Sequence, residues 1–207
     1  MKKLLVPMLC LSFLATSCGS FKAKRVNAEE GDELALDITD KWVDKDTVDA
    51  VSDLIKKIEG HKAFQKYLAK RTKKPKLFIA EVQNETSEAY FPIDNINDEL
   101  LNQFSATGVF TLLDAQQRDN ILKEIKYQND GMVKPEDVRQ IGKQSGADIL
   151  IFGSVRMQPA SRGGKTLKQY SINMRMTEIE SSEEVLRVNT KEQKYSEKSS
   201  NGWKLEI

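Results

Sequence analysis

Two stretches decide the fold: ILIFG at residues 149–153 and YSINMRMT at residues 170–177. The first is a short, continuous apolar run, which is typical of a strand buried on both faces. In the second, apolar residues occupy every second position from Tyr170 to Met176 and polar residues lie between them. Such alternation predicts a strand with one buried and one polar face. The two stretches therefore predict neighbouring strands that belong to one sheet.

The rest of the chain places helices and further strands around this pair. Apolar residues at three- and four-residue spacing predict amphipathic helices, and short apolar runs predict strands. The order is helix, strand, helix, strand, two helices, and then three strands as a meander. This order predicts an α/β (α+β) fold in which a mixed sheet with an antiparallel half is covered by helices. The predicted helices cover residues 46–60, 94–104 and two segments between 114 and 146; the predicted strands cover 76–82, 109–113, 149–152, 170–177 and 185–195.

The N-terminus has the features of a secretory signal. Met1-Lys2-Lys3 is basic, and the apolar segment at 4–15 is too short to span a membrane core of about 30 Å. Small residues then precede Cys18, which resembles a bacterial lipobox, although Ser17 stands where Gly or Ala is usual. We therefore expect cleavage after residue 17 and acylation of Cys18, which would anchor the chain to a membrane. By the same resemblance, Gly19 in place of Asp favours the outer membrane.

The expected domains follow from these segments. Residues 1–17 are a lipoprotein signal peptide, 18–45 a tether, 46–195 the α/β domain and 196–207 a polar C-terminal tail. The tether is polar, but its apolar residues Leu34, Leu36, Ile38 and Trp42 are candidates to dock on the domain. About 25 tether residues would span at most ~85 Å when extended. As a flexible coil they would span ~28 Å.

Composition excludes several classes of function. Lys and Arg total 32 against 31 Asp and Glu, a balance that argues against a nucleic-acid binder. His61 is the single histidine, and both cysteines, Cys10 and Cys18, lie in the first 18 residues. The domain therefore lacks the residues for a site that needs two imidazoles, for a Cys-rich zinc site and for a disulfide framework. We expect neither cofactor nor enzymatic activity, and we interpret His61 as a surface or helix-cap residue.

Two basic features are candidates for binding an acidic protein surface or a polyanionic wall polymer. One is the hairpin that carries Arg156, Arg162, Lys165 and Lys168, which could equally be an ordinary polar turn. Its Gly164-Lys165-Thr166 lacks the upstream glycine and the following helix of a phosphate-binding loop. The other feature is the Lys70–Lys76 stretch, reinforced by Lys62 and Lys66, which could equally be a solvated helix end.

Several segments, in order and spacing, resemble the LpoB family, lipoprotein activators of penicillin-binding proteins. The matching segments are DITDKW at 37–42, KPK at 74–76 through NETSE at 84–88, LDAQQR at 113–118, IGKQSGAD at 141–148 through FGS at 152–154, and 170–180. The resemblance implies a domain similar to the N-terminal domain of TolB, on an outer-membrane lipid anchor facing the periplasm. It further implies a monomeric, non-enzymatic partner of a class A penicillin-binding protein, the peptidoglycan synthase that it stimulates.

One departure and one alternative accompany this resemblance. Enteric members carry a long Pro-rich linker, whereas the tether here has no proline. The alternative is a curli-secretion-type (CsgG-like) lipoprotein of an envelope assembly or secretion system, which the 113–118 and 146–152 segments also resemble. A secretion channel needs long membrane-facing hairpins with alternating apolar residues. The charged segment from Arg156 to Lys168 does not fit that requirement.

Overall fold

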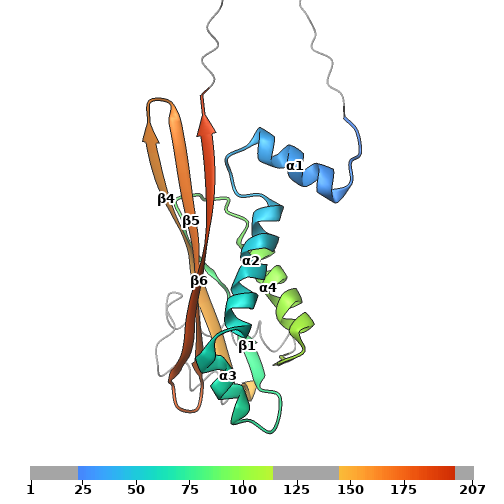
Figure 1. The fold of residues 1–207 in the computed structure, drawn as a ribbon, viewed down its shortest axis with the longest axis vertical. Coiled ribbons are helices and arrows are strands. Elements are labelled where there is room, and N and C mark those ends of the chain that lie inside the picture. Colours follow the sequence, from blue (N-terminus) through green and yellow to red (C-terminus); the bar gives the residue numbers. More distant parts are fainter. Residues whose placement is uncertain (1–22, 114–144, 199–207) are drawn as a thin grey trace, which may run out of the picture.

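A computed structural model describes residues 23–113 and 145–198. Its centre is a mixed sheet with the strand order β3-β1-β4-β5-β6, and β2 also pairs with β4. The parallel half joins β1 to β3 and to β4, whereas β4, β5 and β6 form an antiparallel meander (Figure 1). The strands are β1 (Lys76–Ile79), β2 (Gln83–Glu85), β3 (Thr111–Leu112), β4 (Ile149–Arg162), β5 (Lys165–Glu178) and β6 (Glu184–Glu197).

The described helices are α1 (Ala28–Ile38), α2 (Asp44–Glu59), α3 (Lys62–Ala69) and α4 (Ile93–Thr107). Figure 1 shows α2 and α4 on the same side of the sheet, with α3 near the opposite end from the β4–β5 turn. In α2, Val51, Leu54, Ile55 and Ile58 recur at helical spacing, and all are buried. The helix ends at Gly60, as the sequence predicts.

The main core fills the space between these helices and the sheet. It joins the buried face of α2 to Leu77 and Ile79 of β1 and to Ile151 and Met174 of the long strands. A smaller buried cluster, which includes Phe78 and Leu150, lies on the opposite face of the sheet. Because β1 and the start of β4 have buried residues on both faces, their sequences are continuous apolar runs. The predicted mixed sheet covered by helices is confirmed.

The β4–β5 hairpin is longer than the sequence predicts. The predicted strands cover only 149–152 and 170–177, whereas the ladder continues as far as the Arg162–Lys165 pair. Only Gly163 and Gly164 form the turn, and their φ angles of 60° and 78° suit the two-residue type I′ turn of tight hairpins. Lys165 and Thr166 therefore begin a strand, and the interpretation of this segment as a hairpin rather than a phosphate-binding loop is confirmed.

The segment expected to be a tether contains structure. Residues 28–38 form α1, which begins at Asn27, whose side chain accepts a hydrogen bond from the Glu30 amide at 2.8 Å. No residue of α1 is buried, so the expected docking of Leu34, Leu36 and Ile38 is wrong. Trp42, in contrast, is only 6% exposed and docks on the domain as expected. None of the helices described here is long and apolar enough to cross a membrane.

The remaining boundaries differ slightly. Helix α2 begins at Asp44 rather than 46, because Asp46 caps it from inside, accepting a hydrogen bond from the Val43 amide at 2.8 Å. Strand β6 continues through Ser196 and Glu197, into the segment expected to be a polar tail. The two helices predicted between residues 114 and 146 lie outside the described residues except for positions 145 and 146, and the signal peptide and Cys18 also lie outside them.

Candidate functional site

The three long strands expose a face that carries three of the four basic residues of the predicted hairpin site. Residues paired across neighbouring strands lie on the same face of a sheet, and the face alternates along each strand. Met157, Tyr170 and Ile172 point toward the helices, so their neighbours point away from them. We call the face turned away from the helices the open face. It consists of Arg156, Gln158, Ala160 and Arg162 of β4, Lys165, Leu167, Gln169 and Ser171 of β5, and Lys191, Gln193, Tyr195 and Glu197 of β6.

The open face is basic. Four of its residues are cations, namely Arg156, Arg162, Lys165 and Lys191, and only Glu197 is acidic. Arg156 pairs with Glu85 of β2 at 2.5 Å, and Lys165 pairs with Glu197 at 3.5 Å.

Both pairs are well exposed, since the Arg156 and Lys165 side chains keep 63% and 57% of their surface accessible. Exposed pairs contribute only about 0–1 kcal/mol, so these cations can exchange an internal carboxylate for one on a partner at little cost. Arg162 and Lys191 have no ion pair with another residue of the described ranges.

A row of three amides crosses the middle of the open face. Gln158, Gln169 and Gln193 are direct neighbours on β4, β5 and β6, and all three are exposed. Each amide group offers donors and an acceptor. Tyr195, which is 58% exposed, supplies an aromatic surface next to this row. A surface of cations, amides and one aromatic ring can recognise an acidic protein surface by charge and hydrogen bonding.

Lys168 is separated from the other three residues of the predicted hairpin site. It points toward the helix side, where its ammonium group donates to Asp40 at 3.2 Å and to Glu88 at 3.1 Å. Burial alone would lower the pKa of Lys168, but the hydrogen bonds to Glu88 and Asp40 raise it. The sheet therefore places Arg156, Arg162 and Lys165 on one face. Lys168 lies on the opposite face, where it has a structural role.

Lys168 belongs to an arrangement that holds the N-terminal segment on the sheet. Asp40 also accepts a hydrogen bond from the Ser196 hydroxyl at 2.7 Å, and this bond, with those from Lys168, lowers the pKa of Asp40. Glu88 accepts from the Tyr170 hydroxyl at 3.0 Å, and burial together with this bond raises the pKa of Tyr170.

Two further residues complete this arrangement. The Trp42 ring packs on Phe91 and Tyr170, and its indole donates to the Thr47 hydroxyl at 2.8 Å. Asp46 forms a buried ion pair with Lys194 at 2.8 Å. We call Asp40, Trp42 and Asp46, with their partners on β5 and β6, the N-terminal latch. It fixes where the chain from the N-terminus joins the domain, on the face opposite the open face.

The competing basic stretch lies elsewhere. Lys73 and Lys74 are exposed and follow α3, the helix that lies near the end of the sheet away from the β4–β5 turn (Figure 1). Arg71, in the same stretch, pairs with Glu178 and stacks over the Tyr67 ring at 4.7 Å. Part of this stretch therefore holds the fold together, and the stretch and the open face are separate surfaces.

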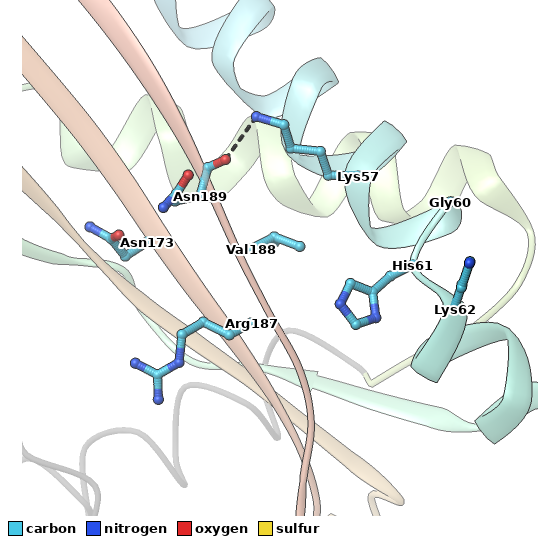
Figure 2. A pocket seen from close by; sticks show the side chains of 8 residues that line it. All are labelled: Lys57, Gly60, His61, Lys62, Asn173, Arg187, Val188 and Asn189. Carbon is cyan, nitrogen blue, oxygen red and sulfur yellow. Dashed lines mark hydrogen bonds between the residues drawn. The ribbon is translucent and has the colours of Figure 1, made fainter.

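A hollow of about 610 Å³ lies at the outer edge of β6. Figure 2 shows Lys57 and His61 on the helix side of β6, and Asn173 and Arg187 on the other side. His61 caps α3, since its Nδ1 accepts a hydrogen bond from the Ala63 amide at 3.3 Å, which confirms the interpretation of this histidine as a cap residue. The part of the chain that the structure describes has no group of metal-ligating side chains.

Sequence reasoning missed the contribution of β6 to the open face. Lys191, Gln193 and Tyr195 became part of this surface only through their pairing with Ser171, Gln169 and Leu167. The alternation of polar and apolar residues in β6 would have shown which of its residues face away from the core. The pairing register, however, depends on the turn before Glu184 and on an irregularity between Met176 and Thr177.

The family model described as "Peptidoglycan-synthase activator LpoB" matches residues 46–191. The LpoB C-terminal domain from Escherichia coli is 17% identical, with a TM-score of 0.52, and the match covers 71% of this chain and 98% of that one. This likeness shows a shared fold.

Two further solved structures were found. The LpoB C-terminal domain from Salmonella enterica is 16% identical over 62% of this chain and 93% of that one, with a TM-score of 0.44. Lipoprotein GNA1162 from Neisseria meningitidis is 14% identical over 61% of this chain and 88% of that one, also with a TM-score of 0.44. No curated protein sequence matches the chain.

Proposed function

Because the chain belongs to the family of peptidoglycan-synthase activators described as LpoB, we propose that it is an outer-membrane lipoprotein that binds and activates a class A penicillin-binding protein. It acts as a monomer and by binding: it shifts the synthase toward its active state through a difference in affinity for the two states. Members of the family regulate synthases and are not a catalytic family, so we assign the chain no covalent step of its own.

The observation that carries the proposal is the basic, exposed open face on a rigid three-stranded support. Arg156, Arg162, Lys165 and Lys191 are fixed by long ladders rather than by a mobile loop. Positioned charges of this kind raise the association rate and select an acidic partner, and their effect weakens with salt. The N-terminal latch is on the opposite face, which leaves the open face accessible while the chain is anchored through its N-terminus.

This assignment predicts a specific loss of binding. Reversing two charges with Arg162→Glu and Lys165→Glu is expected to weaken affinity for the synthase at least tenfold, or about 1.4 kcal/mol. The loss should shrink as ionic strength rises. The matched control reverses two exposed lysines elsewhere, Lys73→Glu and Lys74→Glu, and should leave affinity unchanged. The measurement is a titration of the synthase in detergent at several salt concentrations. Loss of binding only in the Lys73/Lys74 variant would transfer the role to that stretch.

Lipid anchoring at Cys18 gives a second prediction. Several acyl chains, each stabilised by ~0.8 kcal/mol per buried CH₂, would hold the protein durably on a membrane. Replacing Cys18 by alanine is therefore expected to move the protein from the membrane fraction to the periplasmic fraction when cells are fractionated. Replacing Cys10 by alanine is the matched control and should leave the distribution unchanged. A Cys18 variant that stays firmly in the membrane fraction would contradict the assignment.

A further inference from the structure

Among the described residues, the outer edge of β6 presents a regular row of backbone groups that no strand pairs with. Strand β6 ends the strand order, so one of its edges has no neighbouring strand within residues 23–113 and 145–198. Two hydrogen bonds fix which residues point outward. The Lys198 amide donates to the Gly164 carbonyl at 2.9 Å, so these two residues form a hydrogen-bonded pair. Hydrogen-bonded pairs alternate along an antiparallel ladder, so the even-numbered residues of β6 from Leu186 onward are bonded to β5, and the backbone groups of the odd-numbered residues point outward. The Asn189 carbonyl instead accepts from Lys57 at 2.8 Å, on the outer side.

The outward row therefore consists of the backbone amides and carbonyls of Arg187, Asn189, Lys191, Gln193 and Tyr195. Within the described ranges, the bond from Lys57 to the Asn189 carbonyl occupies one acceptor of this row. An edge of this length is a template for an added strand, because each outward residue offers one donor and one acceptor. The hollow of about 610 Å³ lies beside the part of this edge that runs from Arg187 to Asn189 (Figure 2).

The side chains around the edge determine which charge an added strand should carry. Arg187 and Lys191 project from the open side of β6, and Lys57 and Lys62 lie at the ends of α2 and α3 beside the hollow. Arg187 is paired with Glu184 at 2.8 Å and Lys57 with Asp53 at 2.5 Å. Lys191 is therefore the cation of this edge on which the charge preference mainly depends. A second copy of this chain would present the same cations, and an antiparallel pairing centred on Lys191 would place two lysines directly opposite each other. Like charges directly opposite destabilise a strand pair, whereas opposite charges stabilise it. The edge therefore favours an acidic strand over self-pairing.

We propose that the outer edge of β6, from Arg187 to Tyr195, accepts an extended acidic segment of the partner as an added strand. The proposal rests on the proposed function, since the partner is taken to be the synthase. It adds that binding uses backbone hydrogen bonds along the edge as well as charges on the open face. An acidic residue opposite Lys191 would be a direct cross-strand partner of its ammonium group.

A synthetic peptide tests the edge without any synthase. The whole chain in detergent is mixed with acetyl-Val-Glu-Val-Glu-Val-Glu-Val-amide, and hydrogen exchange is measured residue by residue. The expected result is at least fivefold slower exchange at the outward amides of Arg187, Lys191 and Gln193, with no change at the inward amides of Thr190 and Glu192. The matched peptide with lysine in place of glutamate should have no effect. Unchanged exchange at the outward amides would overturn the proposal.

A proline substitution tests the same edge in the complex. Proline removes an amide donor and is tolerated on edge strands where that donor faces solvent. Lys191→Pro should therefore keep the fold, and it should weaken synthase binding at least tenfold more than Lys191→Ala, which removes the charge but keeps the donor. Equal affinities of the two variants would overturn the added strand and leave the proposed function standing. A wild-type chain that binds no class A penicillin-binding protein would overturn the proposed function, while the peptide experiment still decides the edge.

Discussion

Replacing Trp42 by alanine is expected to lower the free energy of unfolding by about 3–5 kcal/mol, the range for removing a large buried aromatic side chain. The ring is 6% exposed and packs on Phe91 and Tyr170 with centroid distances of 5.3 and 5.2 Å. Its removal would also leave the Thr47 hydroxyl without the indole donor at 2.8 Å. The measurement is urea unfolding of the whole chain, followed by circular dichroism.

The matched control is another aromatic residue whose side chain is not buried. Tyr90 is fully exposed, so Tyr90→Ala should change the free energy of unfolding by no more than ~0.5 kcal/mol. A Trp42→Ala variant as stable as the Tyr90→Ala variant would show that the segment before α2 is not held on the domain. The N-terminal latch would then have no role in joining the anchored segment to the sheet.

Breaking the Asp46–Lys194 pair is expected to have a similarly large effect. The two side chains are 10% and 7% exposed and lie 2.8 Å apart. Removing one member of a buried pair leaves an uncompensated charge and costs about 3–5 kcal/mol. Lys194→Met should therefore destabilise the fold by this amount. Adding Asp46→Asn should recover part of the loss, because the amide oxygen can still accept the hydrogen bond from the Val43 amide.

The exposed pair on the open face provides the control for this prediction. Lys165 and Glu197 keep 57% and 52% of their side-chain surface accessible. Lys165→Met should therefore cost less than ~1 kcal/mol. If Lys194→Met costs no more than Lys165→Met, the buried pair does not stabilise the attachment of α2 to β6. The three variants and the wild-type chain can be compared by urea unfolding under identical conditions.

The sheet could be predicted because its strands carry strong local patterns. The run at 149–152 is apolar because both faces of β4 are buried there, and the alternation from Tyr170 to Met176 follows from one buried face. The part of the β4–β5 hairpin near its turn could not be predicted in the same way. Between Gln158 and Lys168 both faces are largely exposed, so no alternation remains, and only the Gly163-Gly164 turn indicates a hairpin.

The candidate site was predicted in part for the same reason. Arg156, Arg162 and Lys165 could be recognised as basic residues of one hairpin, but the face that each occupies depends on the register. One position in register decides whether Lys168 lies with them or points toward Asp40 and Glu88. The helix at 28–38 buries no residue, and its apolar residues Leu34, Leu36 and Ile38 were interpreted as docking points of a tether rather than as part of a helix. Its signals are the Asn27 cap and the acidic residues Glu29 and Glu30 in its first turn.

The central claim is that the open face activates a peptidoglycan synthase by binding it. The direct measurement is the rate of glycan polymerisation by a class A penicillin-binding protein of the same cell, in detergent, with and without the purified chain. The wild-type chain and the Lys73→Glu, Lys74→Glu variant should raise the rate equally. The Arg162→Glu, Lys165→Glu variant should raise it at least tenfold less at the same subsaturating concentration, and the chain alone should polymerise nothing. Equal stimulation by the open-face variant and the wild-type chain would contradict the account.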